Sequence, residues 1–412
     1  MNTFVTHLEA AIDGTHLAAG QIHTVHNGKP IWVRYDLDSV SRQLPKEDLI
    51  KRPNSLWRYR ELLPLPMEVE PVTLGEGMTP QLSCPRLGKH FRLDQLWIKD
   101  ESQLPTGSFK SRGMSVAVSM AHHFGINRLA VPTAGNAGGA LAAYGARAGM
   151  EVFIFMPEDT PVINQIEASL AGAHVFLVNG LINDCGRIVR EGSASMGWFD
   201  MSTLKEPYRL EGKKTMGLEL GEQNDWVLPD AILYPTGGGT GLIGMWKAFQ
   251  EMKQMGWLKS GSMPRLYSCQ SNGCAPIVQA FEKKQRFADP FENAHTLASG
   301  LRVPVAVGDF MMLDAIRESN GSARVGDEFS IKEWMQKAAS LEGISLCPES
   351  AICLDVLNNL VEEGEIKPSE KVVIFNTGAS QKYPEVAPVR LPRINKNHPV
   401  DYQSLVDLSC SS

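Results

Sequence analysis

The sequence predicts an α/β protein whose parallel sheet is covered by helices on both faces. Short apolar runs typical of buried strands, such as residues 151–156 and 371–375, alternate with helix-length segments through most of the chain. This alternation is typical of parallel sheets, because the crossover helices pack on their faces. With 412 residues, 43% of them hydrophobic, the chain is long enough for two or three domains.

Composition and charge exclude several classes of function. The net charge of −6 gives no basic surface for a nucleic acid. The seven cysteines include no CxxC pair, which indicates a reducing compartment instead of a disulfide framework. No run approaches the roughly 20 apolar residues of a membrane span, and the first residues lack the pattern of a secretory signal. We therefore expect a cytoplasmic protein without nucleic-acid or membrane partners.

The first 71 residues are expected to form an N-terminal extension that ends in a proline-rich connector. His16, His23 and His26 fall close together there, but no cysteine and no HExxH spacing accompanies them. Exposed histidines in strands or loops are the commoner explanation, so no metal site is expected. Residues 29–35 alternate as an edge strand does, and residues 54–63 have the pattern of a short helix.

From residue 72 onward, strand and helix patterns follow one another in order. Apolar runs bounded by turn residues predict strands at 96–99, 129–132, 151–156, 174–178, 231–234, 265–270 and 371–375. Segments of helical length predict helices at 113–124, 140–148, 162–171, 183–197, 213–222, 242–254, 274–281, 326–342 and 351–362. Several glycine-rich or hydroxyl-rich loops follow these strands, and in open α/β sheets such loops converge on one ligand.

A lysine between a strand and a helix start is the first candidate for chemistry. Residues 105–113 contain turn-forming residues, hydroxyl groups and Lys110, and Ser108 is the expected N-cap of the helix that follows. Lys110 would lie in the first helical turn, where the helix dipole disfavours an ammonium charge. A lowered pKa favours the neutral amine that Schiff-base chemistry needs. Most lysines are solvated surface groups, so this interpretation depends on the other loops.

A glycine-rich loop after the strand at 231–234 is the second candidate. Small residues let backbone N–H groups approach a phosphate, and the following helix adds a favourable field. Residues 239–244 also match GxGxxG, but the acidic residue that a dinucleotide site needs after the next strand is absent at 270–272. A phosphate on a smaller cofactor fits better. The loop residues are Gly237, Gly238, Gly239, Thr240 and Gly241.

A lysine at a helix start together with a phosphate loop suggests pyridoxal 5′-phosphate (PLP). The segments 105–113, 135–136, 237–241 and 377–378, in this order, resemble the successive signatures of threonine synthases. These enzymes belong to the PLP enzymes similar to the tryptophan synthase β subunit, and the resemblance covers roughly residues 72–385. It implies fold type II architecture, with two open, twisted, mostly parallel sheets flanked by helices and the cofactor in a cleft between a large and a small domain.

The resemblance also implies domain boundaries and an assembly. Residues 72–114 and 206–385 would form the large PLP-binding domain, residues 115–205 a small mobile domain, and residues 386–412 a C-terminal tail. The family further suggests a homodimer that acts on a small amino-acid substrate.

The matching residues receive roles from the resemblance. Lys110 would hold PLP covalently and then move protons at the α and β carbons of the substrate. Asn136 would hydrogen-bond the ring oxygen of PLP, and the backbone of residues 237–241 with the Thr240 hydroxyl would bind its phosphate. Thr377 would face the pyridine nitrogen, and its neutral hydroxyl would leave that nitrogen largely unprotonated. Taken alone, Asn136 could be a turn residue and Thr377 the end of a strand.

Substrate contacts follow from two further matches. Arg209 matches the arginine that binds the substrate phosphate, for which a guanidinium is suited because it donates two parallel hydrogen bonds. A solvated basic turn is the alternative. Thr133 would supply a hydroxyl near the substrate, because Ala137 has none.

The chain departs from the family pattern in two places. Ser111 stands where many threonine synthases have Asp, and no cysteine precedes Cys84 although some relatives begin with a cysteine-bearing knuckle. No zinc is therefore expected there. The implied activity converts O-phospho-L-homoserine and water to L-threonine and phosphate. The alternatives are a serine/threonine ammonia-lyase or a β-replacement enzyme of the same fold, and a PLP-binding or nucleotide-binding protein without catalysis.

Overall fold

The large sheet forms the centre of the computed structural model, which describes residues 3–386, 392–400 and 402. Its strand order is β12-β11-β10-β13-β5-β4, and every neighbouring pair is parallel except the edge pair β4–β5. The strands are β4 (Gln81–Ser83), β5 (Gln95–Asp100), β10 (Ala231–Pro235), β11 (Arg265–Ser271), β12 (Ser322–Gly326) and β13 (Lys371–Asn376).

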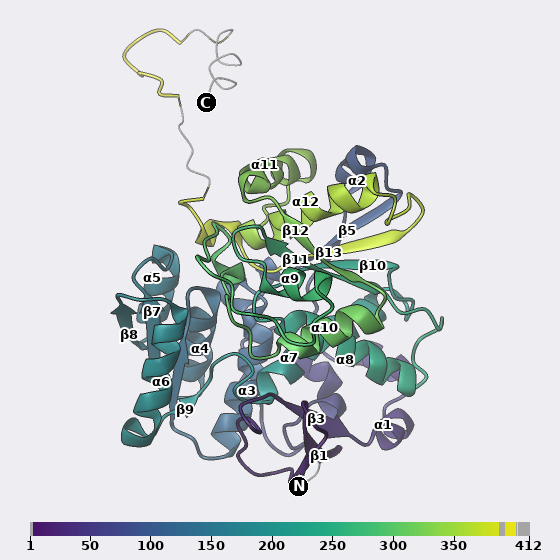
Figure 1. Cartoon of the computed structure of the whole chain (residues 1–412), viewed down its shortest axis with the longest axis vertical. Helices are drawn as coiled ribbons and strands as arrows, with labels where there is room; N and C mark the ends of the chain where they lie inside the picture. The colour runs from purple at the N-terminus through teal and green to yellow at the C-terminus, as the bar shows by residue number, and fades with distance from the viewer. Residues whose placement is uncertain (1–2, 387–391, 401, 403–412) are drawn as a thin grey trace.

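Two helical layers cover the faces of the large sheet (Figure 1). In β13, Val372 and Ile374 belong to one hydrophobic cluster, whereas Val373 and Phe375 belong to the other. Because successive strand residues point to opposite faces, a continuous apolar run predicts burial on both. One layer is α2 (Pro85–Phe91), α11 (Ile331–Glu342) and α12 (Pro348–Glu362). The other is α3 (Lys110–His123), α7 (Tyr208–Gln223), α8 (Thr240–Gln254), α9 (Pro276–Glu282) and α10 (Asp309–Glu318).

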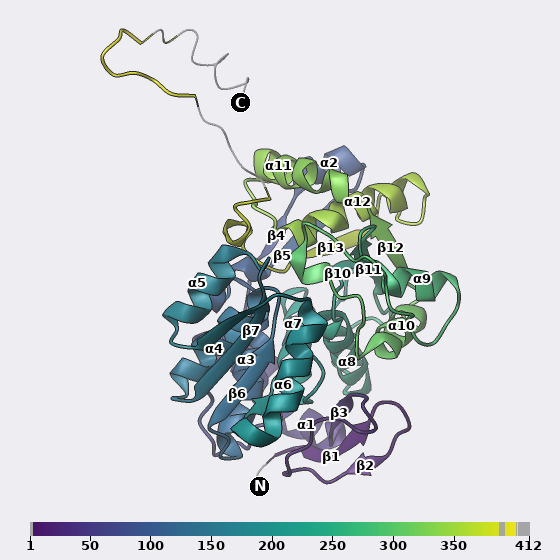
Figure 2. The same ribbon diagram turned by 60° about the vertical axis from the view of Figure 1, so that its left-hand side comes forward.

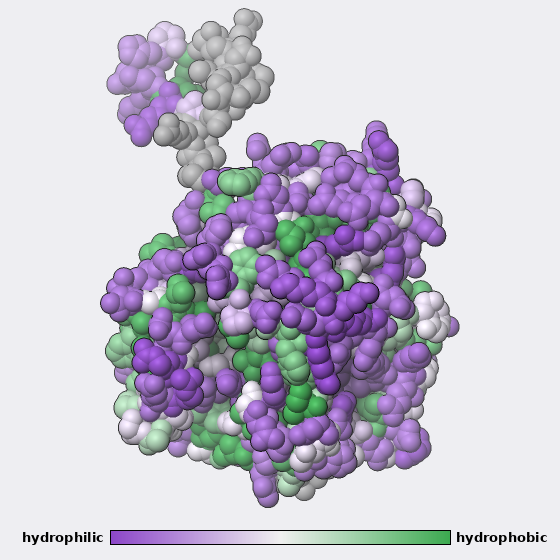
Figure 3. All heavy atoms as spheres, viewed as in Figure 1, coloured by the Kyte–Doolittle hydropathy of each residue, from purple (hydrophilic) through white to green (hydrophobic). Residues whose placement is uncertain are grey.

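A second, small sheet lies beside α3 and α7 (Figure 2). Its order is β8-β7-β6-β9 and all its pairs are parallel. The elements are β6 (Arg128–Pro132), α4 (Asn136–Arg147), β7 (Glu151–Pro157), α5 (Val162–Leu170), β8 (His174–Val178), α6 (Ile182–Met196) and β9 (Phe199–Asp200). This unit is less deeply buried than the large sheet, and apolar side chains of α5 and β8 reach its surface among hydrophilic ones (Figure 3).

The N-terminal residues form a separate antiparallel sheet of order β2-β1-β3. Its strands are β1 (Val5–Ala10), β2 (His16–Leu17) and β3 (Ile31–Tyr35), followed by α1 (Leu37–Gln43). The predicted edge strand at 29–35 is confirmed as β3, and the predicted helix at 54–63 is a 3₁₀ helix, Leu56–Leu62.

Two predictions about helices are wrong. The expected helix at 326–342 begins only at Ile331, because Ser322–Gly326 forms the edge strand β12 and Glu328–Ser330 a 3₁₀ turn. Ser108 is not an N-cap: it has extended backbone, and α3 begins two residues later at Lys110. The predicted tail at 386–412 lies mostly outside the described residues, and no helix within the described part is long and apolar enough to cross a membrane.

Candidate active site

A cavity of about 690 Å³ lies where loops of the large and small sheets meet. Loops that follow β6, β10 and β13 reach it together with the start of α3, as expected for the carboxyl ends of parallel strands. Every residue to which the family resemblance gives a role at the cofactor or the substrate lines this one cavity. These residues are Lys110, Thr133, Asn136, Arg209, Gly237, Gly238, Gly239, Thr240, Gly241 and Thr377.

Lys110 is held in place by the loop before it, which pairs with the segment after β13. The Phe109 amide donates to the Thr377 carbonyl (3.0 Å), and the Ala379 amide donates to the Gly107 carbonyl (2.8 Å). Lys110 is therefore fixed beside Thr377, although the two residues lie far apart in the sequence.

The Lys110 side chain occupies an environment that disfavours its charge. Burial in the surrounding protein and the nearby Arg209 guanidinium together lower the pKa of Lys110 to about 7, against the opposing effect of Glu349. Its Nζ lies 3.7 Å from the centroid of the Phe109 ring. A substantial fraction of the side chain is therefore a neutral amine near pH 7, as a Schiff-base lysine requires.

A second lysine lies behind the same aromatic ring. Lys213 of α7 has its Nζ 4.1 Å from the centroid of the Phe109 ring and donates to the Phe109 carbonyl. Burial and the neighbouring Lys110 hold the pKa of Lys213 well below its ordinary value. Lys213 does not line the cavity, so it supports the backbone of Phe109 from inside the core.

A buried ion-pair network anchors the first turns of α3. Arg112 binds Glu101 (2.5 Å) and Glu219 (2.5 Å), and Lys99 also reaches Glu219 (3.1 Å). All four side chains are fully excluded from solvent. Arg112 and Lys99 together lower the pKa of Glu219 to about 2 despite its burial. The network joins β5, α3 and α7, and so fixes the helix start that carries Lys110.

Ser111, the departure from the family pattern, points away from the cavity. Its hydroxyl donates to the Pro105 carbonyl and lies 3.0 Å from the Thr106 hydroxyl. The side chain is fully buried and does not line the cavity. The presence of Ser111 where relatives have Asp therefore affects the loop behind Lys110 and makes no direct contact with a ligand.

The glycine loop opens α8 and leaves no room for side chains. Gly239 has φ +76°, and a Cβ there would lie 2.1 Å from the Met312 sulfur. A Cβ on Gly241 would lie 1.9 Å from the Tyr234 hydroxyl. Thr240 is the first helical residue, so the N–H groups of this first turn have no partners inside the helix. This arrangement suits a phosphate, which binds backbone N–H groups at a helix N-terminus.

Asn136 and Thr133 approach the cavity from the small sheet. Asn136 is the first residue of α4, and its Nδ2 donates to the Tyr383 hydroxyl (3.0 Å). Its Oδ1 is shielded from solvent and has no hydrogen-bond partner among the described residues. The Thr133 hydroxyl donates to the Gly135 carbonyl (2.9 Å) and accepts from the Gly135 amide (3.1 Å), so it shapes the loop in which Asn136 lies.

Thr377 follows β13 and keeps a neutral environment. Its amide donates to the Ser350 hydroxyl (3.0 Å), and its own hydroxyl lies 3.6 Å from the Cys347 sulfur. Burial raises the pKa of Cys347 to about 12, so the thiol stays protonated. Thr377 lines the cavity, and the thiol beside its hydroxyl is neutral.

Arg209 brings a nearly buried cation to the cavity. Its Nη1 donates to the Met201 carbonyl (2.5 Å), whereas its Nε has no partner within the part of the chain that the structure describes. Burial lowers the pKa of Arg209 although Glu206 lies nearby, and burial also raises the pKa of Glu206 to about 7. The guanidinium therefore lacks full charge compensation, which favours binding of an anion.

Sequence reasoning missed several residues of the cavity wall. Glu349 and Tyr383 lie near Asn136, and Arg302 pairs with Asp159 of the small-sheet unit (2.8 and 2.9 Å). Tyr383 follows Thr377 closely in the chain, which is a local signal that could have indicated it. The missed lining residues with ionisable side chains are Arg190, Asp200, Lys205, Tyr234, Arg302, Glu349 and Tyr383.

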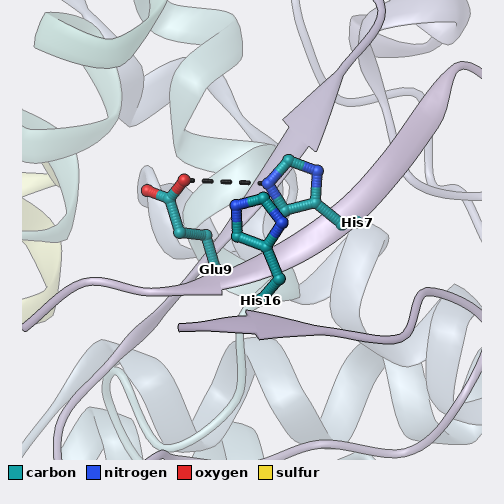
Figure 4. Close-up of side chains that lie close together, drawn as sticks. All are labelled: His7, Glu9 and His16. Carbon is teal, nitrogen blue, oxygen red and sulfur yellow. Dashed lines mark ion pairs between the residues drawn. The ribbon is translucent and has the colours of Figure 1, made fainter. Parts of the chain in front are cut away.

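The histidines of the N-terminal sheet lie on another element. His16 groups with His7 and Glu9, whose ligand atoms all lie within 4.8 Å of one another (Figure 4). The grouping comes from adjacent strands, since Glu9 pairs directly with His16. Arg34 binds Glu9 at 2.6 Å, so a cation already neutralises the carboxylate that a metal would need. The structure does not bring His23 or His26 into this group.

The donor set of the cavity fits PLP. It offers an amine of low pKa, glycine backbone for a phosphate, the side-chain amide of Asn136 for the ring oxygen, and the neutral hydroxyl of Thr377 for the pyridine nitrogen. These groups lie around one cavity and come from separate loops.

Comparisons with known proteins agree with this fit. The family model described as "Pyridoxal-phosphate dependent enzyme" matches residues 72–378. The chain is 34% identical to the threonine synthase of Methanocaldococcus jannaschii, across 89% of this chain and 90% of the relative. It is 36% identical to that of Methanosarcina acetivorans, across 86% of each chain.

Solved structures show the same fold at lower identity. Maize serine racemase superposes with a TM-score of 0.63 at 21% identity, covering 73% of this chain and 88% of that one. Diaminopropionate ammonia lyase from Escherichia coli gives a TM-score of 0.65 at 17% identity, covering 77% and 89%. The predicted fold type II architecture is confirmed, and the chain belongs to the family of pyridoxal-phosphate dependent enzymes.

Proposed function

We propose that the protein is a threonine synthase, which converts O-phospho-L-homoserine and water to L-threonine and orthophosphate by γ-elimination and β-replacement. The observation that carries this proposal is the presence of two separate anion-binding elements around Lys110. One is the glycine loop at 237–241, and the other is Arg209 on α7. A substrate that carries its own phosphate needs the second element in addition to the one that holds PLP.

Bound PLP supplies an electron sink for negative charge at the substrate α carbon. Lys110 Nζ would take the α proton and assist removal of a β proton, and its low pKa, which keeps much of it neutral, supports this role. Arg209 would hold the γ-phosphate and stabilise its charge as the C–O bond breaks. Water then adds its oxygen at the β carbon and gives up one proton to the released phosphate. The two protons taken from the α and β carbons are returned to the γ and α carbons, and Lys110 would be the donor.

The remaining residues hold the cofactor in this account. Asn136 would fix the tilt of the PLP ring, and Thr377 would leave the pyridine nitrogen without a carboxylate partner. The Thr240 hydroxyl and the backbone of residues 237–241 would bind the phosphate of PLP. Thr133 would act through the loop conformation around Gly135, since its hydroxyl is engaged there.

Domain boundaries, assembly and location belong to the same proposal. A large domain of residues 72–114 and 206–385 and a small domain of residues 115–205 are supported by the small sheet, whose strands all lie within 115–205. A cytoplasmic homodimer is proposed from the family resemblance. Light scattering coupled to size-exclusion chromatography would measure the assembly, and a single-chain mass would contradict the dimer.

The assay that tests the activity measures both products from O-phospho-L-homoserine with the PLP-loaded protein. We expect L-threonine and orthophosphate in equal amounts. Absence of both products would contradict the proposal. Formation of ammonia and 2-oxobutanoate from L-threonine, without use of the phosphorylated substrate, would indicate a serine/threonine ammonia-lyase of the same fold.

A further inference from the structure

Three side chains from three distant segments form a continuous hydrogen-bond chain along one edge of the cavity. Asn136 at the start of α4 donates through Nδ2 to the Tyr383 hydroxyl (3.0 Å). Tyr383 donates to Oε1 of Glu349 in the first turn of α12 (2.9 Å). The Gly300 amide donates to the same oxygen (2.8 Å). We call Asn136, Tyr383 and Glu349 the cavity relay.

Donor counting fixes the direction of the cavity relay. A tyrosine hydroxyl has one proton, and Tyr383 gives it to the Glu349 carboxylate, which can only accept. Tyr383 must therefore accept from Asn136, so the NH₂ group of Asn136 faces Tyr383 and its Oδ1 faces elsewhere. Burial and the neighbouring Glu349 hold the pKa of Tyr383 well above its ordinary value, so the hydroxyl keeps its proton.

Burial and position distinguish the cavity relay from an ordinary surface contact. Tyr383 and Glu349 are 3% and 5% exposed, and both line the cavity. Oε2 of Glu349 and Oδ1 of Asn136 are shielded from solvent, and neither has a partner in the described residues. Buried polar atoms normally have hydrogen-bond partners. A buried network that leaves atoms without partners beside a ligand cavity is therefore suited to orienting a group that binds the ligand.

We propose that Tyr383 and Glu349 are positioning residues that orient the Asn136 amide toward the PLP ring. This inference rests on the proposed role of Asn136 at the cofactor, and it adds two residues to which the family signatures assign nothing. Without the Tyr383 hydroxyl, the amide of Asn136 can rotate, and its second N–H no longer points in one direction. The cavity relay also ties the small sheet to the large sheet at the cofactor edge.

The test uses PLP binding by the apo-protein, which does not depend on the identity of the substrate. We expect Tyr383→Phe to weaken PLP binding about tenfold, as loss of one buried hydrogen bond predicts, and to shift the absorption maximum of the bound cofactor. Glu349→Gln should weaken binding less, because a glutamine oxygen still accepts from Tyr383. Tyr267→Phe is the matched control, since Tyr267 lies in β11 and does not line the cavity.

A double-mutant cycle separates a positioning role from a general structural one. If Tyr383 acts through Asn136, then Tyr383→Phe weakens PLP binding in the native chain but not in an Asn136→Ala background. Equal effects in both backgrounds, or an unchanged affinity and spectrum in Tyr383→Phe, would overturn the inference. Failure of phosphohomoserine turnover alone would contradict the proposed function and leave these binding results interpretable.

Discussion

The two walls of the cavity are built in different ways. The wall on the large sheet is anchored by Arg112, Glu101, Glu219 and Lys99, all fully excluded from solvent. The wall on the small sheet is joined to the opposite side of the cavity by polar contacts. One is the ion pair between Arg302 and Asp159, whose side chain is 59% exposed, and there are two more. These are Lys382–Glu167 (2.6 Å) and Tyr383–Asn136 (3.0 Å).

The difference predicts which wall rearranges more easily. Removing one partner of a buried ion pair leaves an uncompensated charge in the interior, so the large-sheet wall resists rearrangement. The Arg302–Asp159 pair is exposed at Asp159 and contributes little, so we expect this contact across the cleft to break at low cost. Lys110 and the glycine loop lie on the fixed wall, whereas Asn136 and Thr133 lie on the wall that can approach. We expect the fixed wall to hold the covalent link and the phosphate of the cofactor, and the other wall to contact the cofactor ring through Asn136 and to close on the substrate.

The largest effect should come from breaking the buried network. Arg112→Met leaves Glu101 and Glu219 without their main partner, and we expect the free energy of unfolding to fall by about 3–5 kcal/mol. Chemical denaturation of the apo-protein measures it. Arg187→Met is the control, because Arg187 is 53% exposed and its pairs lie on the surface of α6. Similar losses in both variants would contradict the distinction between the two walls.

An intermediate effect concerns pH, because the fixed wall sets the pKa of Lys110. Only the neutral amine captures PLP, and a pKa of about 7 means that its fraction rises with pH up to that value. The capture rate by apo-protein should therefore fall about tenfold per unit below pH 7 and level off above it. Stopped-flow absorbance measures this rate. A midpoint near 10.4, the value of a solvated lysine, would show that the wall does not tune the amine.

The smallest effect should come from the contact across the cleft. Asp159→Asn removes the ion pair with Arg302, and we expect a change below about 1 kcal/mol in stability. If the pair helps to hold the two walls together, KM for the phosphorylated substrate changes while PLP affinity does not. High salt should reproduce the effect in the native chain, because exposed charges are screened. A loss of PLP binding in this variant would contradict the prediction, because it would show that Asp159 helps to hold the cofactor.

Local sequence patterns were enough to predict the lysine and the glycine loop of the site. Lys110 and residues 237–241 each combine a strand end, turn-forming residues and a helix start, so each could be recognised from its own segment. The same holds for the buried strand β13, whose apolar run reflects burial on both faces. The parallel order of the sheets followed from the alternation of strands and helices.

What the sequence could not predict depends on contacts between distant segments. Glu349 and Tyr383 become site residues only because β13 and α12 place them beside α4. The error at Ser108 has a local cause: Thr106 adopts φ +60° and Ser108 keeps extended backbone, so the helix begins only at Lys110. His7 and Glu9 lie beside His16 because β1 pairs with β2. The sequence spacing of these residues did not predict that pairing.

The most direct measurement asks which lysine carries the cofactor. Borohydride reduction of the PLP-loaded protein, followed by proteolysis and mass spectrometry, locates the permanently attached group. Attachment to Lys110 is predicted, because Lys110 lines the cavity and has the low pKa that covalent capture needs. Attachment to Lys213, which faces the same Phe109 ring, or recovery of all lysines unmodified would contradict the assignment on which the proposed function depends.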